Sequence, residues 1–323
     1  MLDAVVALEN VSLLYGKRTA VDRLSLTVQA GEIVGLLGPN GSGKSSTLTA
    51  IAGILHPVSG AIRVNGITKS DQPAEYARQI GFVPQEPALY EELSAFANLD
   101  FFASLFDLSR TERRRRIVRV LDRVGLTERA GDRVSTFSGG MIRRLNLAAA
   151  ILHDPSVLLL DESSAALDPD SRDRLFDLLD ELRCDGKAIL FATHHLDEAE
   201  RWCDRVAVLR QGRLVAYGRP SDVFREPFGT SELVGVLRVE LSEPVEETIR
   251  QQLASEVELE IIGRRIRIIA PDAEQLGLAL AVLGSEGAEF DSLATPSPQL
   301  DRLEPAIRGN SSVPIGGLAC SDN

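Results

Sequence analysis

Cysteine is scarce in this chain, and long apolar runs are absent from it. The three cysteines, Cys184, Cys203 and Cys320, are widely spaced, odd in number and free of any C-x-x-C pairing. This usage is typical of a reducing cytosol and indicates neither a disulfide framework nor a thiolate metal site. The longest apolar runs span only a few residues, whereas a membrane-spanning helix needs roughly 20.

Positive charge is also in short supply. The 35 Lys and Arg residues are outnumbered by 47 Asp and Glu residues, which gives a formal net charge of -12 at pH 7. Because affinity for nucleic-acid phosphates comes mainly from clustered Lys and Arg, this balance argues against a nucleic-acid partner and against direct adsorption to anionic lipid. The N-terminal residues Met1 to Ala4 lack the basic start and long apolar core of a secretory signal. We therefore expect a cytoplasmic protein.

The chain has 323 residues, of which 44% are hydrophobic, so it has room for one large domain and a smaller one. We place the large domain, a mixed α/β fold, at residues 1–230. Strand-like alternation at 4–14 and 20–28 predicts an opening antiparallel ribbon. Apolar runs without alternation, which are typical of parallel strands buried on both faces, lie at 33–37, 156–160 and 188–193. The interval 90–153 is nearly all helical in pattern, and we expect a helical subdomain at about 86–155.

The pattern changes after residue 230. Its elements follow the order βαββαβ, which is the ferredoxin-like arrangement, so we predict a small C-terminal domain at 231–296. The predicted strands lie at 237–241, 257–262, 266–269 and 290–293, and the predicted helices at 245–253 and 273–283. From 297 to 323, the abundance of Pro, Ser and Gly predicts a disordered tail.

The strongest chemical signal is one Gly-rich segment that fits the pattern G-x-x-x-x-G-K-[ST]. It reads Gly38, Pro39, Asn40, Gly41, Ser42, Gly43, Lys44, Ser45, and Ser46 follows. It comes directly after the apolar run 33–37 and before a helix predicted at 45–54. In such a loop the backbone N–H groups and the helix dipole hold a polyphosphate, Lys44 reaches the terminal phosphates and Ser45 offers its hydroxyl to Mg²⁺. The sequence therefore predicts a nucleoside triphosphate site.

A second motif narrows the class. The segment Phe137, Ser138, Gly139, Gly140, Met141 lies about twenty residues before an apolar strand that ends in Asp161 and Glu162. The carboxylate of Asp161 is expected to emerge beside the phosphate loop and to hold Mg²⁺ with Ser45. With the phosphate loop far upstream, this order resembles the ATP-binding cassette (ABC) family of ATPases over residues 4 to 230. The resemblance implies a P-loop NTPase fold of the ABC type and ATP as the nucleotide.

The resemblance also implies roles for single residues. Glu162 matches the general base that activates water, and Gln85 matches the glutamine that touches Mg²⁺ and the water and couples to the membrane partner. His194 matches the switch histidine that contacts the γ-phosphate, although His195 is adjacent. Tyr15 matches the aromatic residue on which adenine stacks.

The start of the helix at Ser138 forms a second anion site, since Ser138 suits an N-cap. In the resembled family two cassettes pack head to tail, and this motif completes the nucleotide pocket of the other copy. Asp168 matches the loop that communicates across that dimer. The chain departs from the family pattern at Met141 and Ser46 and at 163–166, but no catalytic atom is lost. Met141 followed by Arg143, Arg144, Leu145 and Asn146 resembles ATPases of multidrug and polyketide exporters.

We therefore expect the ATPase subunit of an ABC transporter, most simply an exporter. It would work with a separate membrane permease and a second ATPase subunit, peripheral on the inner face of the cell membrane. A rival interpretation is a non-transport cassette acting on ribosomes or DNA. The interval between the phosphate loop and Ser138 is only about a hundred residues, too short for the long coiled coils of chromosome-type members. The sequence leaves open the cargo and the choice between homodimer and heterodimer.

Overall fold

The computed structural model describes residues 4–16, 18–162, 167, 169–225, 231–271 and 273–294. The chain forms two compact units, Met1–Pro220 and Ser221–Asn323. The predicted domain boundary at 230 and the predicted tail at 297–323 both lie outside the described residues. Among the described residues, no helix has the length and apolar character needed to cross a membrane.

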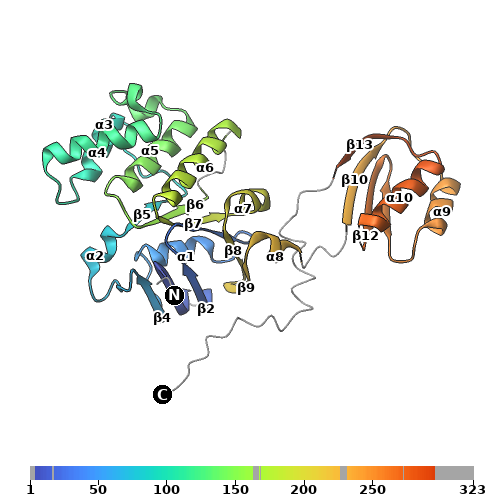
Figure 1. Cartoon of the computed structure of the whole chain (residues 1–323), viewed down its shortest axis with the longest axis horizontal. Helices are drawn as coiled ribbons and strands as arrows, with labels where there is room; N and C mark the ends of the chain where they lie inside the picture. Colours follow the sequence, from blue (N-terminus) through green and yellow to red (C-terminus); the bar gives the residue numbers. More distant parts are fainter. Residues whose placement is uncertain are drawn as a thin grey trace, which may run out of the picture. The chain divides into compact units, whose positions relative to one another are not determined.

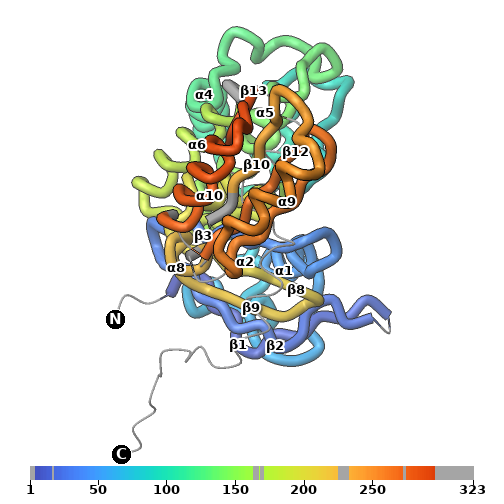
Figure 2. Tube along the Cα trace, turned by 90° about the vertical axis from the view of Figure 1, so that its right-hand side faces the viewer, coloured from blue at the N-terminus to red at the C-terminus, as the bar shows by residue number. Residues whose placement is uncertain are grey.

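An antiparallel sheet opens the first unit, as the alternating pattern predicts. Its strands are β1 (Val6–Tyr15), β2 (Arg18–Val28) and β4 (Ser59–Val64), in the order β2-β1-β4. Alternate residues of β1 and β2 are buried, which gives the ribbon one core face and one exposed face. The two strands run side by side in Figures 1 and 2.

A six-stranded sheet forms the centre of this unit. Its order is β5-β6-β7-β3-β8-β9, and every neighbouring pair is parallel except the last. The strands are β3 (Ile33–Leu37), β5 (Ile80–Val83), β6 (Val157–Asp161), β7 (Ala188–Thr193), β8 (Arg205–Arg210) and β9 (Arg213–Gly218). Every residue of β3, β6 and β7 is buried, which confirms the interpretation of their unbroken apolar runs. Because these strands are parallel, the segments that follow β3, β5, β6 and β7 meet at one edge of the sheet.

Helix α1 (Lys44–Ile51) follows the phosphate loop, as predicted, but it ends earlier than residue 54. The chain turns away there because Gly53 adopts a positive φ of 74°. The sequence analysis did not propose the other helices that cover this sheet. These are α2 (Pro73–Arg78), α6 (Pro169–Cys184) and α7 (Leu196–Trp202), and α8 (Pro220–Arg225) follows β9.

The predicted helical subdomain is present. It contains α3 (Ala95–Ala103), α4 (Arg110–Arg123) and α5 (Gly139–Ile151), together with two short 3-10 turns at Thr127–Arg129 and Val134–Thr136. Each of the three helices begins at a serine whose hydroxyl accepts a hydrogen bond from a backbone N–H, namely Ser94, Ser109 and Ser138. The three helices lie together at the top of Figure 1.

Helix α5 packs directly onto strand β5, and Gly81 allows this close approach. A Cβ atom at Gly81 would lie 2.3 Å from the carbonyl oxygen of Ala150, which no real side chain tolerates. The segment that follows β5 is consequently held beside α5. Gln85 lies in that segment, so the fold places this residue between the central sheet and the helical subdomain.

The second unit has the predicted βαββαβ order. Its elements are β10 (Ser231–Leu237), α9 (Glu243–Gln252), β11 (Glu258–Ile262), β12 (Arg265–Ala270), α10 (Ala273–Ser285) and β13 (Phe290–Ala294). The sheet order β11-β12-β10-β13, antiparallel throughout, is that of a ferredoxin-like fold. Figure 1 shows α9 and α10 on the same side of this sheet, where they share its apolar core.

The prediction of the first strand of this unit was wrong. The alternation of Leu237, Val239 and Leu241 suggested a strand at 237–241, but β10 occupies Ser231–Leu237. Val239 is 74% exposed, so this alternation does not point one face at the core. Residues 231–236 pair with β12 instead, and Gly235 fits there because a Cβ would lie 2.7 Å from the side chain of Leu293.

Candidate nucleotide site

The Gly-rich loop leaves the carboxyl end of β3 and turns into α1. Gly43, directly before the helix, has a φ of 109°, and a Cβ there would lie 2.7 Å from the carbonyl oxygen of Ala20. Gly38 has a φ of 154°, and its Cβ would lie 2.3 Å from the carbonyl oxygen of Leu209. Only glycine tolerates both a positive φ and backbone atoms this close to the position of a Cβ. The loop can therefore present its backbone N–H groups around a phosphate at the start of α1.

Lys44 is held across this loop rather than in solvent. Its Nζ donates hydrogen bonds to the carbonyl oxygens of Gly38 at 2.8 Å and Pro39 at 3.3 Å, and it lies 3.5 Å from the Glu162 carboxylate. The residue is only 4% exposed. Burial lowers the pKa of Lys44, and the negative charge of Glu162 opposes that shift. The ammonium is thus fixed at the loop with its charge little screened by water.

Ser45 and Asp161 bring two oxygen ligands together. The Ser45 hydroxyl donates to Asp161 Oδ1 at 3.0 Å, although the two residues come from α1 and β6. Burial raises the pKa of Asp161, and the hydrogen bond from Ser45 opposes this only in part. A desolvated carboxylate beside a hydroxyl fits a hard cation such as Mg²⁺.

The rest of a magnesium shell is expected from phosphate and water. Within the described residues, no group of three or more His, Cys, Asp or Glu side chains is placed to hold a metal. Mg²⁺ usually takes one or two carboxylates and completes its shell with waters and substrate phosphates. The sparse protein ligands therefore suit a metal that enters with a nucleotide.

Three side chains of this site surround the carboxylate of Glu162. Its Oε1 lies 3.5 Å from both Lys44 Nζ and His194 Nδ1, and its Oε2 accepts a hydrogen bond from Gln85 Nε2 at 3.4 Å. Its backbone N–H donates to the carbonyl of Ala192 at 3.1 Å, and its φ of 45° lies in the left-handed region. Such a conformation is costly for a side chain like glutamate and is found mostly at functional sites.

Glu162 and the three side chains around it come from four separate segments. Lys44 follows β3, Gln85 follows β5, Glu162 follows β6 and His194 follows β7. The structure thus brings together the residues that the sequence analysis proposed for catalysis. Of the two neighbouring histidines, His194 is the one whose ring lies beside the Glu162 carboxylate.

A buried network behind His194 was not anticipated. The Thr193 hydroxyl donates to Glu198 Oε2 at 2.7 Å and accepts from the backbone N–H of His195 at 3.0 Å. Glu198 is 3% exposed, and Arg172 of α6 lies 3.5 Å from its other oxygen. A carboxylate in the first turn of α7 was the available signal, but a sequence offers many such residues. This network fixes the turn that carries His194.

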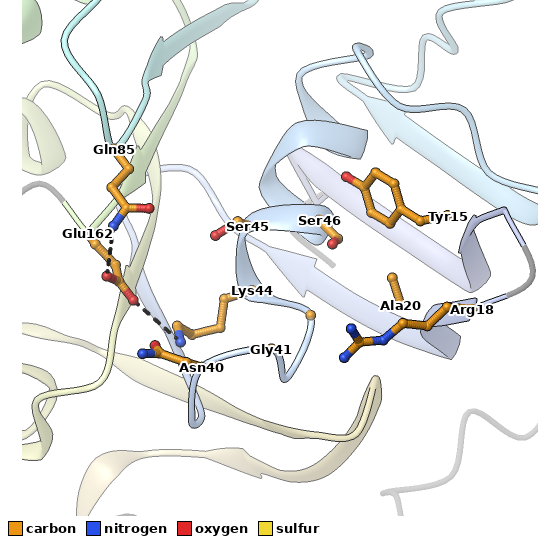
Figure 3. A pocket seen from close by; sticks show the side chains of 11 residues that line it. Tyr15, Arg18, Ala20, Asn40, Gly41, Lys44, Ser45, Ser46, Gln85 and Glu162 are labelled. Atoms are coloured by element: carbon orange, nitrogen blue, oxygen red, sulfur yellow. Dashed lines mark hydrogen bonds and ion pairs between the residues drawn. The ribbon is translucent and has the colours of Figure 1, made fainter.

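A cleft of about 510 Å³ lies above the loop. Figure 3 shows Gln85 and Glu162 on one side of it, Tyr15 and Arg18 on the other, and Lys44 between them. Tyr15 ends β1 and is 53% exposed, so its ring is available for stacking on a base. The cleft is also lined by Ala20, Asn40, Gly41, Gly43, Ser45 and Ser46. Arg18 and Ala20 were not proposed from sequence, because their positions gave no chemical signal.

The second motif contributes no residue to the lining of this cleft. Ser138, Gly139 and Gly140 form the start of α5, where the Ser138 hydroxyl accepts from the N–H of Met141 at 3.4 Å. Ser138 and Gly139 are exposed. Asp168 lies outside the described residues, so its placement stays a prediction.

We expect Asp161→Asn to raise the stability of the folded protein and to weaken its binding of Mg-ATP. Because burial raises the pKa of Asp161, the folded protein holds this proton more tightly than the unfolded chain, and the carboxylate lowers stability above that raised pKa. We expect Asp161→Asn to raise the unfolding midpoint at pH 7 by a few degrees and to remove Mg²⁺-dependent stabilisation by ATP.

Calorimetry from about pH 4 to pH 8, with and without Mg-ATP, checks this expectation. The gain should shrink as the pH falls through the raised pKa of Asp161 toward the ordinary carboxyl range, because the folded and the unfolded protein then both become protonated at this residue. The exposed Asp122 gives a matched control, and Asp122→Asn should change neither property. A lower midpoint for Asp161→Asn at pH 7 would contradict the argument.

The fold and the site together define a P-loop ATPase cassette with an inserted helical subdomain. A family model described as "ABC transporter" matches residues 21–165. The linearmycin resistance ATP-binding protein LnrL of Bacillus subtilis is 41% identical over 215 residues, which cover 67% of this chain and 69% of that protein. The Nod factor export ATP-binding protein I of Rhizobium meliloti is 39% identical over 287 residues, covering 88% and 83%. The chain therefore belongs to the ABC transporter family, among its ATP-binding proteins.

Solved structures agree with this assignment. The structure titled "Structure of ATP binding subunit of ABC transporter" is similar at a TM-score of 0.63 with 34% identity, covering 68% of this chain and 92% of that one. The ATP-binding cassette MJ0796, solved as a dimer bound to ADP and Pi, is similar at a TM-score of 0.61 with 29% identity, covering 67% and 98%. In each case the covered share of this chain is about the length of its first compact unit.

Proposed function

We propose that this protein binds and hydrolyses ATP to drive an exporter whose membrane permease is a separate chain. The observation that carries the proposal is the convergence of Lys44, Gln85 and His194 on the carboxylate of Glu162, beside the phosphate loop. Relatives named for Nod factor export and linearmycin resistance support export as the direction.

The residues divide the work of hydrolysis. Lys44 binds the terminal phosphates, and its charge stabilises the transferring phosphoryl group. Glu162 accepts a proton from the attacking water, while Gln85 orients the carboxylate and the water. His194 offers a ring nitrogen to the γ-phosphate. Ser45 and Asp161 would hold Mg²⁺, which when bound neutralises phosphate charge.

Two copies of the chain would complete each site. Ser138 and Gly139 are exposed at the start of an α-helix and do not line the cleft of their own chain. A helix N-terminus with free N–H groups attracts phosphate, so a second copy placed head to tail would meet the nucleotide with this end. The ATP-binding cassette MJ0796, solved as a dimer, supports an assembly of two copies by analogy.

The permease would dock on the helical subdomain near Gln85. Tyr90, Leu93 and Phe101 are exposed, and the Tyr90 and Phe101 rings meet edge to face at 5.1 Å. An exposed aromatic cluster next to a segment that contacts the catalytic carboxylate suits an apolar helix of a partner. Docking there would hold the protein at the inner face of the cell membrane.

Co-expression with the cognate permease tests the proposal. We expect the protein to be recovered with membranes only when the permease is present, and Phe101→Asp to release most of it while its own ATP hydrolysis survives. Val118, an exposed apolar residue of α4, gives the control, because Val118→Asp should leave recovery unchanged. Equal recovery with and without permease would refute the transporter interpretation, and co-sedimentation with ribosomes would favour the non-transport alternative.

A further inference from the structure

Two neighbouring arginines of α5 reach in different directions. The guanidinium of Arg144 donates to the carbonyl oxygens of Val124 at 2.8 Å and Gly125 at 3.5 Å, both inside the helical subdomain. The guanidinium of Arg143 instead donates from Nη1 to the carbonyl oxygen of Gln85. Arg143 therefore ties α5 to the segment that follows β5.

That segment continues to the catalytic carboxylate. The Gln85 side chain donates from Nε2 to Glu162 Oε2 at 3.4 Å, while its backbone carbonyl is held by Arg143. One residue thus receives a contact from α5 on its main chain and makes a contact with Glu162 through its side chain. The chain of contacts runs from α5 to Glu162 without a gap.

The same helix begins at the exposed anion site. Ser138 caps α5, and Arg143 follows five residues later, little more than one turn along the helix. An α-helix is rigid over this length, so a movement of its N-terminus also moves the base of the Arg143 side chain. Ser138, at one end of this stretch, is exposed at the anion site, whereas Arg143, at the other end, contacts Gln85 of the same chain.

The Arg143 contact is suited to carry such a movement. Arg143 is half-buried, and burial lowers the pKa of its guanidinium, which nevertheless stays charged. A hydrogen bond from a charged donor to a carbonyl is stronger than a neutral one, and it is strengthened further where water is partly excluded. Loss of the donor would leave the segment around Gln85 free to shift relative to α5.

We propose that Arg143 is a positioning residue that holds Gln85 against Glu162. In this way it links the hydrolytic carboxylate to the helix whose N-terminus meets the nucleotide of the partner copy. The proposal rests on the proposed function of Glu162 as general base. It predicts that Arg143 affects turnover only through Gln85.

A double-mutant cycle in the full-length protein tests this link. Arg143→Met keeps a long apolar side chain but removes the donor. In the Gln85 background we expect kcat for ATP to fall about 10-fold with KM changed less than about 2-fold, since contacting residues couple by this order. In the Gln85→Ala background the same substitution should lower kcat less than about 2-fold, because the group it positions is gone.

Arg144→Met is the matched control on the same helix. It removes contacts within the helical subdomain, so we expect a lower unfolding midpoint. Any loss of turnover should be the same factor with Gln85 present and in the Gln85→Ala variant. Equal losses for Arg143→Met in both backgrounds, or a raised KM with unchanged kcat, would overturn the proposal. Glu162→Gln serves as the reference: if it hydrolyses ATP normally, the proposed function fails, whatever the cycle shows.

Discussion

Glu162→Gln is expected to abolish steady-state ATP hydrolysis while ATP binding persists. The amide has nearly the same size as the carboxylate and keeps one oxygen acceptor, which can face either Gln85 Nε2 or His194 Nδ1, now 3.4 and 3.5 Å from the two carboxylate oxygens. It cannot accept a proton from water. General-base groups contribute roughly 10²- to 10⁴-fold to a rate, so kcat should fall by that factor. Steady-state turnover and equilibrium ATP affinity, measured on the same preparation, check both halves of this expectation.

Two further variants make the result specific. Lys44→Ala should lose affinity as well as turnover, because its ammonium lies at the phosphate loop. Glu92→Gln changes an exposed glutamate and should alter neither quantity. Turnover of Glu162→Gln within a few-fold of the unmodified protein would remove Glu162 from the role of base. A parallel loss of ATP affinity would assign it to binding instead.

The local parts of this molecule could be predicted from sequence because each depends on neighbours along the chain. The loop from Gly38 to Ser45 combines glycines that permit its turns with a lysine and a serine at fixed spacing. Ser138 has the side chain of an N-cap and lies directly before an amphipathic helix, and it does cap α5. Strands β3, β6 and β7 are apolar up to the polar residues that end β6 and β7, because both faces of each strand are covered.

The assembly of the site required the order of the strands. β7 lies between β3 and β6, which places His194 next to Glu162 and lets α1 present Ser45 to Asp161. No pattern within a single strand encodes which strand is its neighbour. The resemblance to a family supplied the roles of Gln85 and His194, but their distances to Glu162 come only from the fold.

Contacts made by long side chains to backbone atoms were beyond sequence reasoning. The sequence analysis named Arg143 and Arg144 together, as part of one motif, yet they bind carbonyl groups in different parts of the first unit. Nothing in the sequence distinguishes the backbone carbonyl of Gln85 from that of any other residue. The error in the first strand of the second unit had another cause: Val239 and Leu241 continue the alternation of Leu237, but the paired strand ends at Leu237.

Ser138→Arg is expected to prevent the ATP-driven dimer. In the Glu162→Gln background, which binds ATP without hydrolysing it, the protein should become a dimer on addition of ATP and Mg²⁺, as light scattering would show. A long cationic side chain at an exposed helix start would fill the space in which the partner's phosphates must lie. Ser109→Arg makes the same substitution at the N-cap of α4 and removes a comparable capping bond, so its dimer should survive.

Mixing two inactive variants tests whether Ser138 acts on the partner copy. Ser138→Arg keeps its own phosphate loop, whereas Lys44→Ala keeps its own Ser138. Each variant alone should show turnover near background.

In a mixed dimer, the phosphate loop of Ser138→Arg and the helix start of Lys44→Ala form one intact site. We therefore expect hydrolysis to reappear on mixing, at up to about half the normal rate per mixed dimer, because one of its two sites is complete. No recovery would mean that Ser138 serves the nucleotide of its own chain, or that one intact site cannot close the dimer. Mixing Ser138→Arg with the unmodified protein separates these outcomes. The mixed dimer then has one intact site, and neither of its phosphate loops is changed.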